Sequence, residues 1–165
     1  MTDTLTKHEK NLGAIMHAST FGKYLIPFGN FIFPLILWLA NKDEKPFIDY
    51  NGKKVLNFQL SIFIYSVAVL AIGIPLFIGF TPELFQNGLF NIWEYINFHD
   101  SNFDDINFHI STDMFFPGFK LWPLGLTGLL IGALNIINII YSILGTIKTN
   151  EGQYFKYPFT INFIK

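Results

Sequence analysis

Side chains able to bind a metal are concentrated in one part of the sequence. His99 and His109 lie close to the carboxylates of Asp100, Asp104 and Asp105. Imidazole and carboxylate groups together could hold a divalent ion, but their spacing here matches no strong metal motif, so a solvated acidic loop is the better interpretation. The chain also has no cysteine. We therefore predict no metal site and no cofactor.

His17 lies within an apolar stretch. A histidine near a membrane could relay protons or contact a partner, although such a side chain is more often a packing residue. The sequence contains no Ser-His-Asp set, no pair of inward carboxylates, no phosphate-binding glycine loop and no dinucleotide fingerprint. We keep His17 as a candidate functional residue and predict that the protein has no catalytic site and is not an enzyme.

Uncharged polar side chains on two long apolar segments form the second candidate site. Asn135 and Asn138 would be costly facing lipid, so we expect them to point into protein. With Asn57 and Gln59 they could line a polar path, or they could form hydrogen bonds between helices. The full candidate set for helix packing or a polar path comprises Asn57, Gln59, Ser61, Gly128, Gly132, Asn135, Asn138 and Ser142.

Long apolar helices must carry these side chains. Residues 55–82 and 121–147 contain no charged side chain. Each stretch of about 27 residues would make a helix of about 40 Å, enough to cross about 30 Å of hydrocarbon. A buried helix of a soluble protein would show a polar stripe on its outer face, and neither stretch has one. In the second stretch, Gly128 and Gly132 have the spacing that lets two helix backbones touch.

Residues 11–41 allow two interpretations. They could form one span with an irregular start, which gives three crossings in all. They could instead form a short hairpin of two helices turning near Gly22 and Lys23, which gives four. Lys7 and Lys10 favour the hairpin, because they place the amino terminus on the same side as the lysine-rich segment that follows.

The segment between the two long spans has a different character. Residues 81–118 are rich in Asp and Glu and contain no lysine, so we predict an acidic, outward-facing loop. It begins with a short amphipathic helix and continues with a repeat of the form Asn-Phe-x-x. The fold prediction is an all-α integral membrane protein of about four helices, a short N-terminal hairpin plus two long spans. It forms a single membrane domain over residues 1–165 with this loop outside the membrane.

The distribution of lysine predicts the orientation. Residues 41–54 hold four lysines beside three acids and should be cytoplasmic together with the carboxyl terminus, which places residues 81–118 outside the cell or in the periplasm. We expect a multi-pass protein of the cell (inner) membrane. Residues 49–52 read as a turn before a helix that Lys53 opens. All basic residues are lysine, which argues against a nucleic-acid partner.

Three pieces of the chain carry a resemblance to a known family. They are IPFGN at 26–30 through Trp38, KDEKPFIDYNGK at 42–53 followed by LNFQ at 56–59, and Lys148 followed by NEGQYFKYP at 150–158. His17 also occupies a histidine position of this pattern. Together they resemble a small bacterial membrane family of unknown function, similar to the Tic-twenty-like membrane component of the chloroplast inner-envelope protein-import translocon.

The resemblance implies about four membrane helices, no assigned activity and no catalytic residues. The chain departs from the family pattern in its outer loop, residues 81–118, and at Lys54, where an acidic residue is common. Our leading hypothesis is a non-enzymatic scaffold for membrane assembly, and its link to polypeptide translocation depends on the resemblance alone. The alternative is a small channel or solute transporter lined by the Asn and Gln side chains, and a third hypothesis is a sensor in the outer loop. The expected partners are the lipid bilayer and further copies or other membrane proteins.

Overall fold

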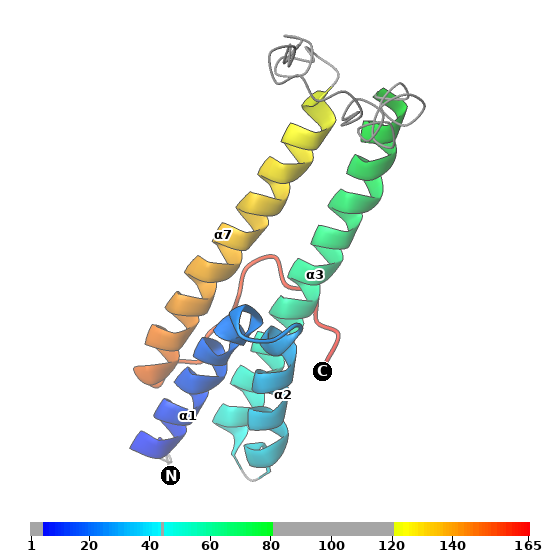
Figure 1. Ribbon diagram of the computed structural model, residues 1–165. Helices are drawn as coiled ribbons and strands as arrows, with labels where there is room; N and C mark the ends of the chain where they lie inside the picture. Colours follow the sequence, from blue (N-terminus) through cyan, green and yellow to red (C-terminus); the bar gives the residue numbers. More distant parts are fainter. Residues whose placement is uncertain (1–4, 44, 81–120) are drawn as a thin grey trace, which may run out of the picture. The chain divides into compact units, whose positions relative to one another are not determined.

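The computed structural model describes residues 5–43, 45–80 and 121–165, and this part of the chain is helical apart from turns and an extended carboxyl-terminal segment. The elements are α1 (Lys7–Ala18), the 3-10 helix η1 (Ser19–Tyr24), α2 (Gly29–Asn41), α3 (Pro46–Phe80) and α7 (Trp122–Asn150) (Figure 1). The prediction of an all-α protein with four α-helices, two of them long, is confirmed, and the described residues contain no strand. The amphipathic helix and the repeat predicted within 81–118 lie outside the described residues.

α1 begins at a signal that is readable in the sequence. The backbone N–H of Glu9 donates to the Thr6 hydroxyl at 3.2 Å, while the Glu9 carboxylate accepts from the Thr6 backbone N–H at 2.8 Å. This reciprocal pair satisfies two donors that would otherwise lack partners at the start of the helix. The Glu9 carboxylate also lies at the positive end of the helix dipole, and this electrostatic interaction further stabilises the first turn.

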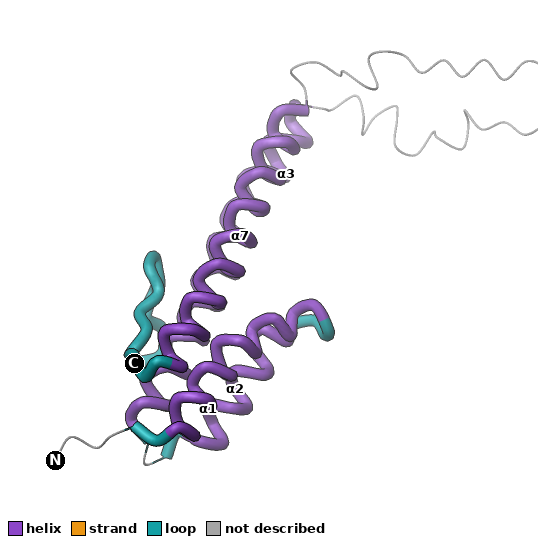
Figure 2. The backbone as a smooth tube through the Cα atoms, turned by 90° about the vertical axis from the view of Figure 1, so that its left-hand side faces the viewer, coloured by secondary structure: helices purple, strands orange, loops and turns teal. Residues whose placement is uncertain are grey.

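α1 and α2 form the predicted hairpin and lie side by side (Figure 2). The turn depends on glycine, because a Cβ at Gly29 would overlap the backbone of Gly22 and a Cβ at Gly22 would overlap the ring of Phe33. Phe28 caps α2 in the left-handed region with φ 61°, a conformation that costs a phenylalanine about 1 kcal/mol or more. The chain therefore reverses direction within residues 24–28.

Helices of 12 and 13 residues are too short to cross a bilayer. They rise about 18 and 20 Å, against about 30 Å of hydrocarbon. A hairpin of such short helices does not add two crossings. The predicted total of four crossings therefore does not follow from the presence of the hairpin. The candidate spans found in the described residues are α3 and α7, with 35 and 29 residues.

α3 begins earlier than the sequence suggested. Residues 49–52 are helical, so the predicted turn before Lys53 is wrong. The helix starts at Pro46, whose missing N–H costs nothing in a first helical turn. Gly52 is required for a different reason, since a Cβ there would overlap the side chain of Trp38 on α2. Gly52 thus lies at a close approach between α2 and α3, and not in the turn that the sequence predicted.

Two compact units make up the chain, one of Met1–Val67 with Gly132–Lys165 and one of Ala68–Ile131. The first contains the hairpin, the start of α3, the end of α7 and the carboxyl-terminal segment, and it holds both apolar clusters. One cluster is Met16, Trp38, Phe47, Ile48 and Leu56, and the other is Val55, Phe58 and Tyr157. In the second unit α3 and α7 approach closely where Gly73 meets Thr127, and the rings of Phe80 and Trp122 meet edge to face.

Apolar side chains on the two long helices face outward. Only 6% of the most apolar window of α3 and 17% of that of α7 are buried within the chain, and their mean hydropathy values are 2.4 and 1.9. A core helix of a soluble protein would be mostly buried against its neighbours. Long helices that are apolar and yet exposed within their own chain are typical of lipid contact.

Candidate functional site

His17 lies at the centre of a fully buried polar cluster that we call the His17 cluster (His17, Asn51, Thr149 and Tyr157). Its Nδ1 is 2.6 Å from the Tyr157 hydroxyl and its Nε2 is 3.3 Å from the Asn51 Oδ1. Asn51 Oδ1 also accepts from the Thr149 hydroxyl at 3.3 Å and the Phe155 backbone N–H at 3.4 Å. The cluster thus joins α1, α3, the end of α7 and the carboxyl-terminal segment.

The hydrogen bonds assign the protons of this cluster. Asn51 presents its oxygen to His17, because its Nδ2 donates to the Phe47 carbonyl at 2.9 Å. His17 Nε2 must therefore carry the proton, and Nδ1 accepts from the Tyr157 hydroxyl. Burial lowers the pKa of His17 from 6.5 to about 4 and raises the pKa of Tyr157. Both groups are neutral at pH 7, so at that pH the cluster connects these segments through uncharged hydrogen bonds.

A second polar group connects the hairpin to both long helices, and we call it the Gln59 network (Lys23, Asn30, Gln59, Asn135 and Asn138). Gln59 Oε1 accepts from Asn30 Nδ2 at 3.0 Å and from Asn138 Nδ2 at 2.9 Å. The Lys23 ammonium donates to Asn138 Oδ1 at 3.4 Å and to Asn135 Oδ1 at 3.2 Å. Three of the four residues proposed for a polar path are thus brought together.

Asn57 and Ser61 face the carboxyl-terminal segment instead. Asn57 Oδ1 accepts from the backbone N–H groups of Phe163 and Ile164 at 3.0 and 2.8 Å, and its Nδ2 donates to the Ile164 carbonyl at 2.9 Å. Ser61 Oγ accepts from the Ile161 backbone N–H at 2.9 Å. These side chains act as hydrogen-bond partners for an extended segment that has no strand beside it.

Ser142 is buried and its hydroxyl lies within hydrogen-bond distance of the Thr20 hydroxyl, at 3.1 Å. The Thr20 hydroxyl donates its one proton to the His17 carbonyl at 2.8 Å, so it accepts in its contact with Ser142. This contact ties α7 to the end of α1 near the His17 cluster.

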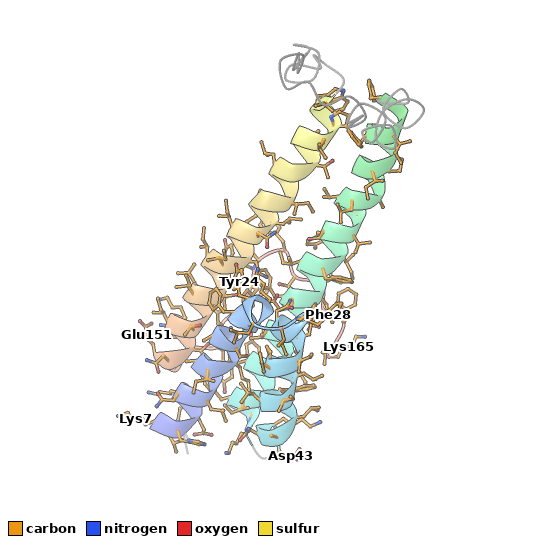
Figure 3. All side chains as sticks on the ribbon, in the orientation of Figure 1. Lys7, Tyr24, Phe28, Asp43, Glu151 and Lys165 are labelled. Atoms are coloured by element: carbon orange, nitrogen blue, oxygen red, sulfur yellow. The ribbon has the colours of Figure 1, made fainter. Side chains whose placement is uncertain are left out.

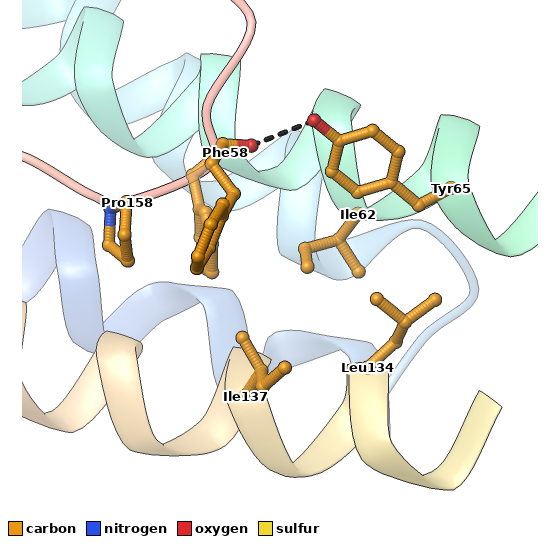
Figure 4. Close-up of a pocket in the computed structure, with 7 residues that line it drawn as sticks. Phe58, Ile62, Tyr65, Leu134, Ile137 and Pro158 are labelled. Carbon is orange, nitrogen blue, oxygen red and sulfur yellow. Dashed lines mark hydrogen bonds between the residues drawn. The ribbon is translucent and has the colours of Figure 1, made fainter. Parts of the chain in front are cut away.

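Beside the carboxyl-terminal segment lies an apolar groove of about 300 Å³ (Figure 4). Tyr65 closes one side of it by donating to the Phe159 carbonyl at 2.9 Å. The other lining residues are Phe58, Ile62, Leu134, Ile137 and Pro158. None of the Gln59 network lines this groove, so it provides no polar path.

The glycines of α7 differ from the other glycines in their surroundings. A Cβ at Gly125, Gly128 or Gly132 would have no heavy atom within 4 Å, whereas one at Gly73 would overlap Thr127. Gly128 and Gly132 thus present a helix face that no other described residue covers. Residues that could hold a metal are not grouped in threes or more in the part of the chain that the structure describes. His99 and His109 lie outside that part.

Sequence reasoning missed Lys23, Asn30, Asn51 and Tyr157 as site residues. Lys23 had a clear signal, since it is the only charged residue between Lys10 and Lys42. A lone ionisable group in an apolar stretch is expected to have a specific partner. The pairing of His17 with Tyr157 had no such signal, because 140 positions separate the two residues.

A model of one protein family matches residues 8–164, which is nearly the whole chain. The chain belongs to the MamF/MmsF family, the magnetosome magnetite crystal formation protein family. Membership confirms a small bacterial membrane family, but it does not show the predicted similarity to the Tic-twenty-like group. No curated protein and no solved structure gave a significant match to the chain.

Magnetosome family membership and the two exposed apolar helices together place the protein in a membrane. The family concerns the formation of magnetite crystals, which agrees with a membrane role other than catalysis. The polar clusters described above connect helices.

Proposed function

We propose that this magnetosome-family protein is a non-enzymatic membrane scaffold that associates with copies of itself through the glycine face of α7. The observation that carries the proposal is the open space around Gly125, Gly128 and Gly132 on a helix that is otherwise apolar and exposed. Glycines spaced four apart let two helix backbones approach closely in lipid, where packing contacts drive association. The described residues of the chain leave this face uncovered.

The orientation belongs to the same proposal. The lysine-rich residues 41–54 and the carboxyl terminus lie on the cytoplasmic side of the membrane. Residues 81–118 would then lie on the opposite side, and a carboxylate-rich loop would face the compartment in which a crystal forms. Polypeptide translocation would be a more specific form of the scaffold role, and it is supported only by the resemblance noted above.

Assembly in lipid tests this proposal. Gly128→Leu and Gly132→Leu place bulky side chains on the face that would touch a second copy, so we expect them to convert an oligomer into a monomer in lipid nanodiscs. Gly79→Leu is the matched control, because Gly79 on α3 is also open within the chain. The oligomeric state is measured by subunit counting. An unchanged oligomer in both α7 variants would contradict the proposal, and so would a wild-type monomer.

The Gln59 network favours one second candidate, a small channel or transporter. Gln59, Asn135 and Asn138 share a hydrogen-bonded network with Lys23, as a polar path would require. Solute flux in reconstituted vesicles that is lost in Asn135→Leu and Asn138→Leu would support this function. The scaffold is favoured instead if these changes affect only assembly.

A further inference from the structure

Hydrogen-bond donors outnumber acceptors in the Gln59 network, and Lys23 is the cause. Its ammonium group can only donate, so Asn138 must turn its oxygen toward Lys23. The Asn138 Nδ2 then donates to Gln59, which must present Oε1. Asn30 donates to that same oxygen from α2. The charge at Lys23 thus fixes the direction of every amide in the network.

Gln59 Nε2 is left without a partner by this arrangement. The side chain is only 1% exposed, and Nε2 is a buried donor with no hydrogen-bond partner among the described residues. Exchanging the oxygen and nitrogen of the Gln59 amide would place its NH₂ group against the NH₂ groups of Asn30 and Asn138. The exchange therefore does not give Nε2 an acceptor. A buried donor without an acceptor destabilises a protein, and such a group in a native fold calls for an explanation.

Lys23 also lacks a carboxylate partner within the described residues. Their ion pairs join Lys53 to Asp49 and Lys148 to Glu151, and the contacts of Lys23 are amide oxygens and the ring of Tyr24. The network therefore has an uncompensated positive charge and unused N–H donors. The complementary group is an anion with several acceptor oxygens.

The surroundings of Lys23 indicate where such an anion comes from. The hairpin turn exposes Tyr24, Leu25 and Phe28 by 65%, 80% and 63%, and Figure 3 places Tyr24 and Phe28 at the opposite end of the hairpin from Lys7 and Asp43. Along α3, about 20 residues separate Gln59 from the aromatic end of the helix, which is about 30 Å of rise and matches the thickness of the hydrocarbon. A bilayer crossed by this part of α3 would therefore have a headgroup layer at the level of the network.

We propose that the Gln59 network binds the phosphate of an anionic phospholipid. The Lys23 ammonium supplies the charge and Gln59 Nε2 supplies neutral N–H donors, while the apolar turn at 24–28 contacts the acyl chains. Basic pockets between membrane helices bind acidic headgroups by this combination of charge and apolar contact. The site is distinct from the glycine face and does not depend on the scaffold function.

Native mass spectrometry of the detergent-purified chain tests the proposal, with phosphatidylglycerol as the added probe. Lys23→Met should weaken retention of this lipid about tenfold, because a charge-assisted hydrogen bond is lost. Lys156→Met, at an exposed lysine of the carboxyl-terminal segment, is the matched control and should retain it. A phosphate-free glycolipid with the same acyl chains should show no dependence on Lys23.

Gln59→Glu keeps the test independent of folding. A carboxylate at this position accepts from Asn30 and Asn138, leaves no donor unpaired and supplies the missing negative charge. We expect this variant to melt at or above the wild-type temperature while retention of phosphatidylglycerol is lost. Unchanged retention in both Lys23→Met and Gln59→Glu would overturn the proposal. Binding of inorganic phosphate alone, with the same dependence on both residues, would overturn the assignment to a lipid.

Discussion

At the scale of single residues, polar side chains hold the hairpin and the carboxyl-terminal segment to the long helices. The His17 cluster is fully satisfied and neutral, whereas the Gln59 network is charged and has an unpaired donor. Buried polar groups whose hydrogen bonds are all made favour a single packing arrangement. A buried polar group without a hydrogen-bond partner calls for an explanation, such as a partner outside the chain. The two groups therefore have different roles although both lie in the same compact unit.

His17 should make stability depend on pH. Its pKa is about 4 in the folded chain against an ordinary value of 6.5, so the unfolded chain takes up a proton first as the pH falls. The stabilisation is present above about pH 6.5 and is lost as the pH falls toward 4, by up to about 3 kcal/mol. Chemical unfolding in detergent between pH 7.5 and 4.5 measures it. His17→Gln should flatten this dependence and His8→Gln, at an exposed residue, should not; equal slopes in all three proteins would refute the assignment.

At the scale of the elements, glycines lie at the points where helices approach one another most closely. Gly52 allows α3 to approach Trp38, Gly73 allows α3 to approach Thr127, and the pair Gly22 and Gly29 forms the hairpin turn. Sequence analysis predicted the hairpin and both long helices from apolar length and lysine placement. It missed the start of α3, because an Asp-Tyr-Asn-Gly run resembles a turn until the Trp38 contact is known.

Gly52→Ala should destabilise the protein by about 1–3 kcal/mol, because the new methyl group overlaps the Trp38 side chain and forces the helices apart. Gly79→Ala is the matched control on the same helix. It meets nothing within 4 Å and should stabilise by about 0.5–1 kcal/mol through helix propensity. Thermal unfolding in detergent measures both variants. The packing account fails if Gly52→Ala is neutral or stabilising.

Asn57→Leu should release the carboxyl-terminal segment. The side chain of Asn57 makes three hydrogen bonds to the backbone of residues 163 and 164, and no helix or strand replaces them there. Hydrogen exchange at the amides of Phe163 and Ile164 should accelerate at least about tenfold if each lost bond contributes about 1 kcal/mol. Exchange in α1 serves as the internal control. Unchanged protection at both amides would contradict this role of Asn57.

At the scale of the whole molecule, apolar length predicted the fold class, but pairing across long sequence distances did not follow from it. Gln59 and Asn138 are 79 positions apart and both were chosen as polar residues on apolar helices. Asn57 is two residues from Gln59, so it points to a different side of α3 and binds the carboxyl-terminal segment. Which segment it meets there depends on the tertiary fold. Family membership then gave a biological setting that no single residue indicated.

In the orientation that we propose, α3 and α7 cross a bilayer while the hairpin and the carboxyl terminus stay on one side. The chain has no cysteine, so single cysteines in place of Asp43, Asp105 and Thr160 can be labelled without background. A membrane-impermeant maleimide applied to sealed, oriented vesicles reports which side each position faces. We predict that positions 43 and 160 react from one side and position 105 from the other. Reaction of all three positions from the same side would contradict the account.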